Sequence, residues 1–134
     1  IAVFKAHTFS RVEEFANEFA NALNLADKAY VMDINYDREN PEDYPGVSAY
    51  TIIDKLDNGD YIEQGMSEKL LEFDNSVILF MSSKEIYFLE DEYKKLKEHF
   101  NIIIEYKGVE KYTSLEGTIG RPHVAKAIEE KYNN

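Results

Sequence analysis

The chain has 134 residues, of which 44% are hydrophobic and 13% aromatic, with a formal net charge of −11 at pH 7 and no cysteine. That length suits one compact domain with a sizeable core, and no apolar run approaches the roughly 20 residues of a membrane span. The acidic balance argues against nucleic acid or an anionic membrane surface as a partner, while the lack of cysteine excludes a disulfide scaffold, a thiolate metal site and a cysteine nucleophile, and fits the cytoplasm.

The first third of the chain predicts a strand, a helix and a second strand. The chain does not begin with Met and enters a buried strand directly at Ala2–Phe4, as expected of a piece of a longer protein without a signal peptide. A helix over about residues 11–25 follows, with apolar positions three or four apart at Val12, Phe15, Ala16, Phe19, Ala20 and Leu23. Ser10 and Glu13 predict a capping box at its start. Ala29–Ile34 is short and apolar, which favours a buried parallel strand.

The remaining segments continue this alternation. They are expected to be a helix capped by Ser48, a strand around Tyr61 and Ile62, a short helix from Ser67, a buried strand at Val77–Met81, a charged helix from Lys84 to about His99, a strand over residues 101–106 and a helix from Pro122. The pattern predicts an α/β domain with an open, Rossmann-like, mostly parallel sheet and helices on both faces. In that architecture ligands bind at the carboxyl ends of the strands.

Charged side chains follow the first two predicted strands at this edge. His7 and Arg11 lie across a strand-to-helix turn, where both could face a ligand carboxylate or phosphate beside the helix N-terminus. The ordinary alternative is that His7 bonds a loop carbonyl and Arg11 pairs with a nearby acid. Asp33, Arg38 and Glu39 could bind an amino group or magnesium, or could cap a turn and be solvated. Spacing alone leaves both interpretations open.

Two further residues are weaker candidates. Lys84 could reach a phosphate, although a solvated helix start explains it better. His123 could ligate a metal, but no second ligand is placed beside it, so we predict no metal site. The sequence has no GxxxxGK[ST], GxGxxG, GxSxG or HExxH motif. The residues by themselves therefore predict a fold and a candidate anion site without predicting a reaction.

Five segments in consistent order resemble a known family. They are HTFSR (7–11), LADK (25–28), DINYDRE (33–39), PGVS (45–48) and FDNSVILFMSSKEI (73–86). Over residues 1–97 the chain is similar to the C-terminal, amino-acid-binding domain of the Mur ligases, and within them to the branch that joins L-alanine to UDP-N-acetylmuramate in peptidoglycan precursor synthesis. Residues 98–134 would be an extension of unknown role packed on the same domain.

The resemblance implies one domain of a three-domain enzyme. An N-terminal domain would hold the UDP-sugar and a central domain would hold ATP and Mg²⁺. In the family, ATP phosphorylates the muramoyl carboxylate, and the amine of L-alanine then displaces phosphate from the acyl phosphate. By position, Arg11 would orient the alanine carboxylate or the acyl-phosphate charge, and His7 would help to fix the amino acid. The chain alone would be inactive and would carry no catalytic residue of its own.

Two departures from the family pattern keep alternatives open. Lys5 and Ala6 stand where the family usually has Gln and Pro. The segment 82–86 (SSKEI) stands where the family has a glycine loop, GAGDI, and so lacks the close backbone approach that glycine permits. This change and the added tail favour a non-catalytic, ligase-like interaction module as the main alternative. A related ligase that acts on murein peptides is a third interpretation, against which HTFSR argues.

Overall fold

The structure is a computed structural model that describes residues 1–82 and 86–107, and the side chains among these up to residue 99. The chain divides into two compact units, one of Ile1–Gln64 with Ser76–Phe88 and a second of Gly65–Asn75 with the chain from Leu89 onward. The four predicted substrate-binding residues, His7, Arg11, Asp33 and Arg38, all belong to the first unit. The predictions for Lys84, His123 and the helix from Pro122 lie outside the described residues.

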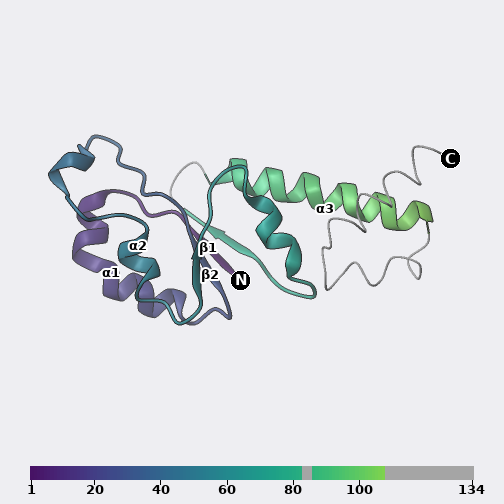
Figure 1. Cartoon of the computed structure of the whole chain (residues 1–134), viewed down its shortest axis with the longest axis horizontal. Coiled ribbons are helices and arrows are strands. Elements are labelled where there is room, and N and C mark those ends of the chain that lie inside the picture. The colour runs from purple at the N-terminus through teal and green to yellow at the C-terminus, as the bar shows by residue number, and fades with distance from the viewer. Residues whose placement is uncertain (83–85, 108–134) are drawn as a thin grey trace. The chain divides into compact units, whose positions relative to one another are not determined.

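The first unit is built on a four-stranded, all-parallel sheet (Figure 1). Its strands are β1 (Ala2–Phe4), β2 (Ala29–Val31), β3 (Gly59–Tyr61) and β4 (Leu79–Met81). They lie in the order β3-β2-β1-β4, with Ala2 opposite both Ala29 and Leu79. The crossover from β3 to β4 runs from one edge of the sheet to the opposite edge, as in doubly wound folds. The predicted α/β, Rossmann-like fold with a parallel sheet is confirmed.

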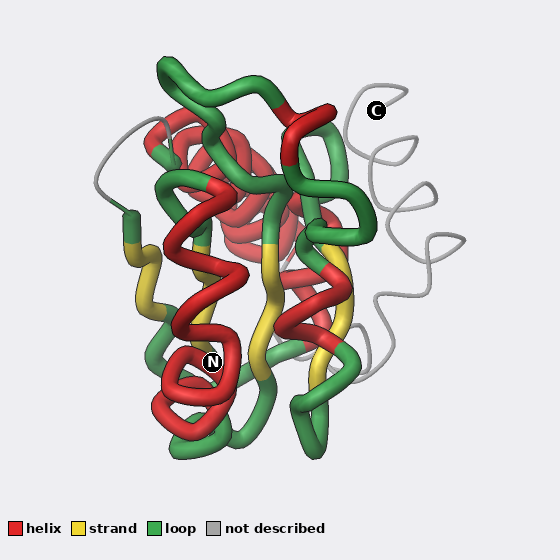
Figure 2. The backbone as a smooth tube through the Cα atoms, turned by 90° about the vertical axis from the view of Figure 1, so that its left-hand side faces the viewer, coloured by secondary structure: helices red, strands yellow, loops and turns green. Residues whose placement is uncertain are grey.

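Helices α1 (Phe9–Leu23) and α2 (Tyr50–Ile53) pack on one face of this sheet, in front of the strands in Figure 2. Four of the six residues predicted for the apolar face of α1 are buried, whereas Phe15 is 41% exposed. The buried residues join the strand residues and α2 in one core cluster: Ala2, Ala6, Val12, Ala16, Ala20, Leu23, Ala29, Val31, Ile34, Ala49, Ile52 and Ile53. The N-cap of α2 is Ala49 and not the predicted Ser48, although the Ser48 hydroxyl accepts a hydrogen bond from the backbone N–H of Tyr50 (3.2 Å). This core holds α1 against β1 and β2.

Strand β4 differs from its prediction. The run Val77–Met81 was expected to be buried, but β4 is an edge strand. The side chains of Val77, Leu79 and Met81 are 74%, 56% and 38% exposed. Apolar composition predicted the strand correctly, whereas its burial depends on what covers it.

The second unit is helical where it is described. It contains the 3₁₀ helix η2 (Ser67–Glu72) and α3 (Tyr87–Lys107) from Leu89 onward. The carboxylate of Glu92 accepts a hydrogen bond from the backbone N–H of Gly65 (2.8 Å), which ties the two segments together. The strand predicted over 101–106 is wrong, because α3 continues through these residues.

The sequence offers a reason for this longer helix. The three-to-four spacing of apolar residues that begins at Leu89, Tyr93 and Leu96 continues at Phe100 and Ile103. The predicted boundary at residue 97 thus falls inside α3, and the division into 1–97 and 98–134 stays a prediction. Within the described ranges, no helix is both long and apolar enough to cross a bilayer.

Candidate functional site

The carboxyl edge of the sheet brings the segment after β1 beside the segment after β2. The backbone N–H of Asn35 donates to the carbonyl of Ala6 (2.9 Å), and the N–H of Thr8 donates to the carbonyl of Asn35 (2.7 Å). His7 and Asn35 form a single parallel bridge. These bonds extend the β1–β2 pairing past the strands and fix His7 next to the loop over 33–39.

Helix α1 starts differently from the prediction. Its N-cap residue is Thr8, which has a φ of 73° and makes no side-chain capping bond. Instead, Oε1 of Glu39 accepts hydrogen bonds from the backbone N–H groups of Phe9 (2.6 Å) and Ser10 (3.3 Å). The predicted Ser10–Glu13 capping box is therefore wrong, because the Ser10 N–H, which would donate to Glu13 in the box, donates to a carboxylate about thirty residues further along the chain.

This capping contact changes the electrostatics of the site. The Ser10 hydroxyl, with help from the backbone N–H groups and the Tyr44 hydroxyl, lowers the pKa of Glu39 against the opposing effect of burial. The hydrogen bond to Glu39 in turn raises the pKa of Tyr44. Glu39 is thus held as an anion at the positive end of the helix dipole. Two of the N–H groups that an external anion would use at this helix end, those of Phe9 and Ser10, are therefore already bonded.

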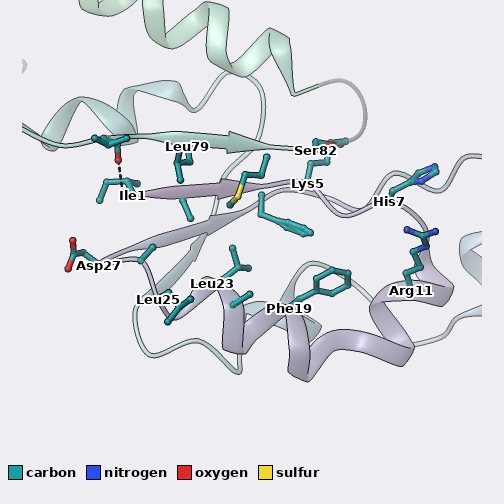
Figure 3. A pocket seen from close by; sticks show the side chains of 16 residues that line it. Ile1, Lys5, His7, Arg11, Phe19, Leu23, Leu25, Asp27, Leu79 and Ser82 are labelled. Carbon is teal, nitrogen blue, oxygen red and sulfur yellow. Dashed lines mark hydrogen bonds between the residues drawn. The ribbon is translucent and has the colours of Figure 1, made fainter.

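His7 and Arg11 lie next to this cap and line the same groove (Figure 3). The Nε2 atom of His7 is 3.4 Å from Oδ2 of Asp37, and this contact is ionic only when His7 is protonated. That Nε2 atom is buried, and no acceptor or donor among the described residues forms an aligned hydrogen bond with it. Arg11 is exposed. Figure 3 shows its guanidinium pointing from the first turns of α1 toward the side where His7 lies.

The guanidinium of Arg11 has no ion-pair partner among side chains 1–82 and 86–99. It is therefore a cation at the ligand-binding edge of an α/β fold that no acid of the described chain neutralises. A carboxylate or phosphate is the group that its planar fork of donors binds best. The structure thus brings together the two residues that the HTFSR segment singled out.

Asp33 and Arg38 are placed differently. A carboxylate oxygen of Asp33 accepts a hydrogen bond from the Tyr61 hydroxyl (2.8 Å), and the Asp33 backbone carbonyl accepts one from Nζ of Lys5 (3.1 Å). Burial, together with the bond to Asp33, raises the pKa of Tyr61, so Tyr61 stays a neutral donor. Asp33 therefore has a structural partner. Arg38 is exposed on the loop.

An apolar groove between α1 and β4 is a feature that sequence reasoning missed. Its cavity volume is about 720 Å³. Its apolar walls include Phe4, Phe19, Leu23, Val77, Leu79 and Met81. Lys5, His7 and Arg11 line the end at the carboxyl edge of the sheet, and Asp27 lines the other end (Figure 3). The sequence predicts this groove only weakly, because an apolar run does not indicate which helix will pack against it.

The part of the chain that the structure describes contains no group of three His, Asp or Glu side chains placed to hold a metal ion. Among models of known protein families, none matches this chain.

Proposed function

We propose that this chain is the C-terminal domain of a Mur ligase that adds L-alanine to UDP-N-acetylmuramate in the cytoplasm, and that it contributes part of the amino-acid site. One observation carries the proposal beyond the resemblance of sequence. Arg11, which no described acid neutralises, and His7 line one groove at the carboxyl edge of a parallel sheet. That is the edge at which such folds bind ligands.

In this function Arg11 binds the carboxylate of L-alanine through paired N–H donors and so orients the amine toward the acyl carbon. His7 stands beside it as a hydrogen-bonding group, held by the bridge to Asn35 and by the contact to Asp37. Glu39 has a structural role, since it fixes the first turn of α1 and therefore the backbone position of Arg11. ATP and Mg²⁺, held by the central domain, would supply the phosphoryl group that activates the muramoyl carboxylate. These are positioning roles, and the chain alone performs no step.

A non-catalytic, ligase-like module is the second candidate. The observation that favours it is the contact of Glu39 with Phe9 and Ser10, because these two N–H groups cannot bind a substrate anion while they donate to Glu39. In the module, Arg11 would meet an acidic group of a partner protein instead of a substrate. Both candidates use the same cation, so the test must measure turnover.

The test is an assay of the full-length polypeptide that carries this domain, with ATP, Mg²⁺, UDP-N-acetylmuramate and L-alanine. We expect formation of the alanyl product by the full-length protein and none by residues 1–134 alone. Arg11→Ala should raise the KM for L-alanine about ten- to a hundredfold, the loss typical of a hydrogen bond to a charged group. Arg11→Lys should recover part of this loss, because a lysine keeps the charge without the paired donors.

Lys55→Ala is the matched control, since Lys55 is an exposed cation after the end of α2, away from the carboxyl edge of the sheet. It should leave the KM unchanged. Full-length protein that makes no product would favour the module. An Arg11→Ala enzyme with wild-type kinetics would refute the role given to Arg11.

A further inference from the structure

Among the described residues of the first unit, helices cover one face of the sheet over three strands and not over the fourth. Helices α2 and α1 lie side by side in front of β3, β2 and β1, whereas the leftmost strand of Figure 2, β4, has no helix of the first unit in front of it. The side chains of Val77, Leu79 and Met81 are left exposed along one face of the chain leading into and through β4. Parallel sheets are ordinarily covered on both faces. The structure therefore has a place beside α1 where a further helix would complete the layer.

The shape of the groove suits a helix. One wall is the side of α1 with Phe19 and Leu23, and the floor is formed by Phe4 of β1 and Leu79 of β4. Helix α1 has 15 residues and a length of about 22 Å at 1.5 Å per residue. Packed helices lie about 8–10 Å apart, so a neighbour of α1 in this layer would lie over β4. Such a neighbour would bury the apolar side chains of β4 that α1 does not reach.

The charges at the two ends of the groove give this helix a direction. Lys5, His7 and Arg11 line the end at the carboxyl edge, and Asp27 lines the opposite end, where the N-terminal ammonium of Ile1 donates to the Val77 carbonyl (2.8 Å; Figure 3). In α/β layers the helices run antiparallel to the strands, as α1 does here, so the first turn of an added helix would lie at the cationic end. Acidic residues are also favoured in a first turn by the helix dipole. Acidic residues in the first turn of the added helix would therefore interact favourably with its dipole and also with Lys5, His7 and Arg11.

We propose that the groove between α1 and β4 is the docking site for a partner's amphipathic α-helix, with acidic residues in its first turn and an apolar face that covers Val77, Leu79 and Met81. This inference goes beyond the proposed function and does not require it. A module that acts without turnover would need such a surface, and a ligase domain could carry it as well.

The test is selection from a displayed library of 15-residue peptides against the purified chain. Every member has leucines at helical spacing, and its first and last turns are varied among Asp, Asn and Lys. We expect binders with Asp enriched in the first turn and not in the last. Leu79→Glu should weaken the selected peptides at least about tenfold, since it places a charge in the apolar floor. Leu79 is 56% exposed, so this variant should fold.

Tyr87→Glu is the matched control, because it adds the same charge at a residue that is 68% exposed and does not line the groove. It should bind the selected peptides as the parent chain does. No enrichment, enrichment of Asp in the last turn, or binders that ignore Leu79→Glu would overturn the proposal. Sodium dodecanoate that binds in the groove while no peptide does would assign the site to an anionic amphiphile instead. Dimerisation of the chain that Leu79→Glu abolishes would assign the face to a second copy.

Discussion

Two neighbouring regions of one sheet face behave in opposite ways. Over β1 and β2 the face is closed by α1 and α2, and Val12, Val31 and Ile52 are fully buried there. Over β4 no helix among the described residues of the first unit covers the face, although the run into β4 is as apolar as the run that forms β2. The difference teaches that apolar composition determines where a strand forms, whereas a helix packed against it determines whether its side chains become core.

The largest expected effect tests the closed region. Ile52→Ala should lower the free energy of unfolding by about 2–5 kcal/mol, because it removes buried methyl groups and leaves a cavity between α2 and the sheet. Urea denaturation of the two proteins measures the difference. The matched variant in the open region is Leu79→Ala, which should change stability by no more than about 0.5 kcal/mol, as is usual for exposed sites. Equal losses from the two variants would show that the two regions do not differ.

A smaller loss of stability tests the cap that joins the first turn of α1 to the loop over 33–39. Glu39→Gln should lower the urea midpoint at pH 7, because the charged acceptor of the Phe9 and Ser10 N–H groups is lost. The folded-state pKa of Glu39 lies below its ordinary value of 4.5. The stabilisation is therefore present above pH 4.5 and is lost as the pH falls through the lower, folded-state pKa. The difference between the two proteins should disappear in that acidic range.

Glu18→Gln provides the comparison for this measurement, since Glu18 is exposed in the middle of α1 and caps nothing. It should not reproduce the acid-dependent loss. If the urea midpoint of Glu39→Gln at pH 7 equals that of the parent chain, Glu39 does not stabilise the start of α1.

The smallest effect concerns the rim of the closed region. Tyr61→Phe removes the hydroxyl that donates to Asp33 and should cost about 0.5 kcal/mol, the low end for a single exposed hydrogen bond. Tyr36→Phe removes a hydroxyl from a side chain that is 55% exposed and should cost nothing measurable. Identical urea midpoints for both variants would mean that the bond to Asp33 adds no stability.

Local patterns in the sequence predicted most of the fold and only part of the site. The strand at Ala2–Phe4 and the apolar stripe of α1 follow from spacing, and the parallel order follows from the alternation of elements. The cap of α1 could not be predicted in this way, because Glu39 reaches it across about thirty residues. The local Ser10–Glu13 pair also provides an acceptor for the Ser10 N–H in the sequence pattern. Non-local contacts of this kind leave no periodic signal.

The two errors concerning strands have a similar origin. The isoleucines over 101–106 have the composition of a strand, but they continue the helical spacing that starts at Leu89. The run Val77–Met81 has the composition of a central strand and lies at an edge. Position in the sheet is a property of the whole topology, and neither composition nor spacing within five residues encodes it.

The most direct test of the contrast between the two regions uses the protein's own methionines. Met32 is 2% exposed, whereas Met81 at the end of β4 is 38% exposed, and oxidation by hydrogen peroxide follows the exposure of the sulfur. Mass spectrometry of peptides from the intact, briefly oxidised chain would give both rates in one sample. We expect Met81 to form the sulfoxide at least about tenfold faster than Met32. Equal protection of Met81 and Met32 would contradict an open face over β4.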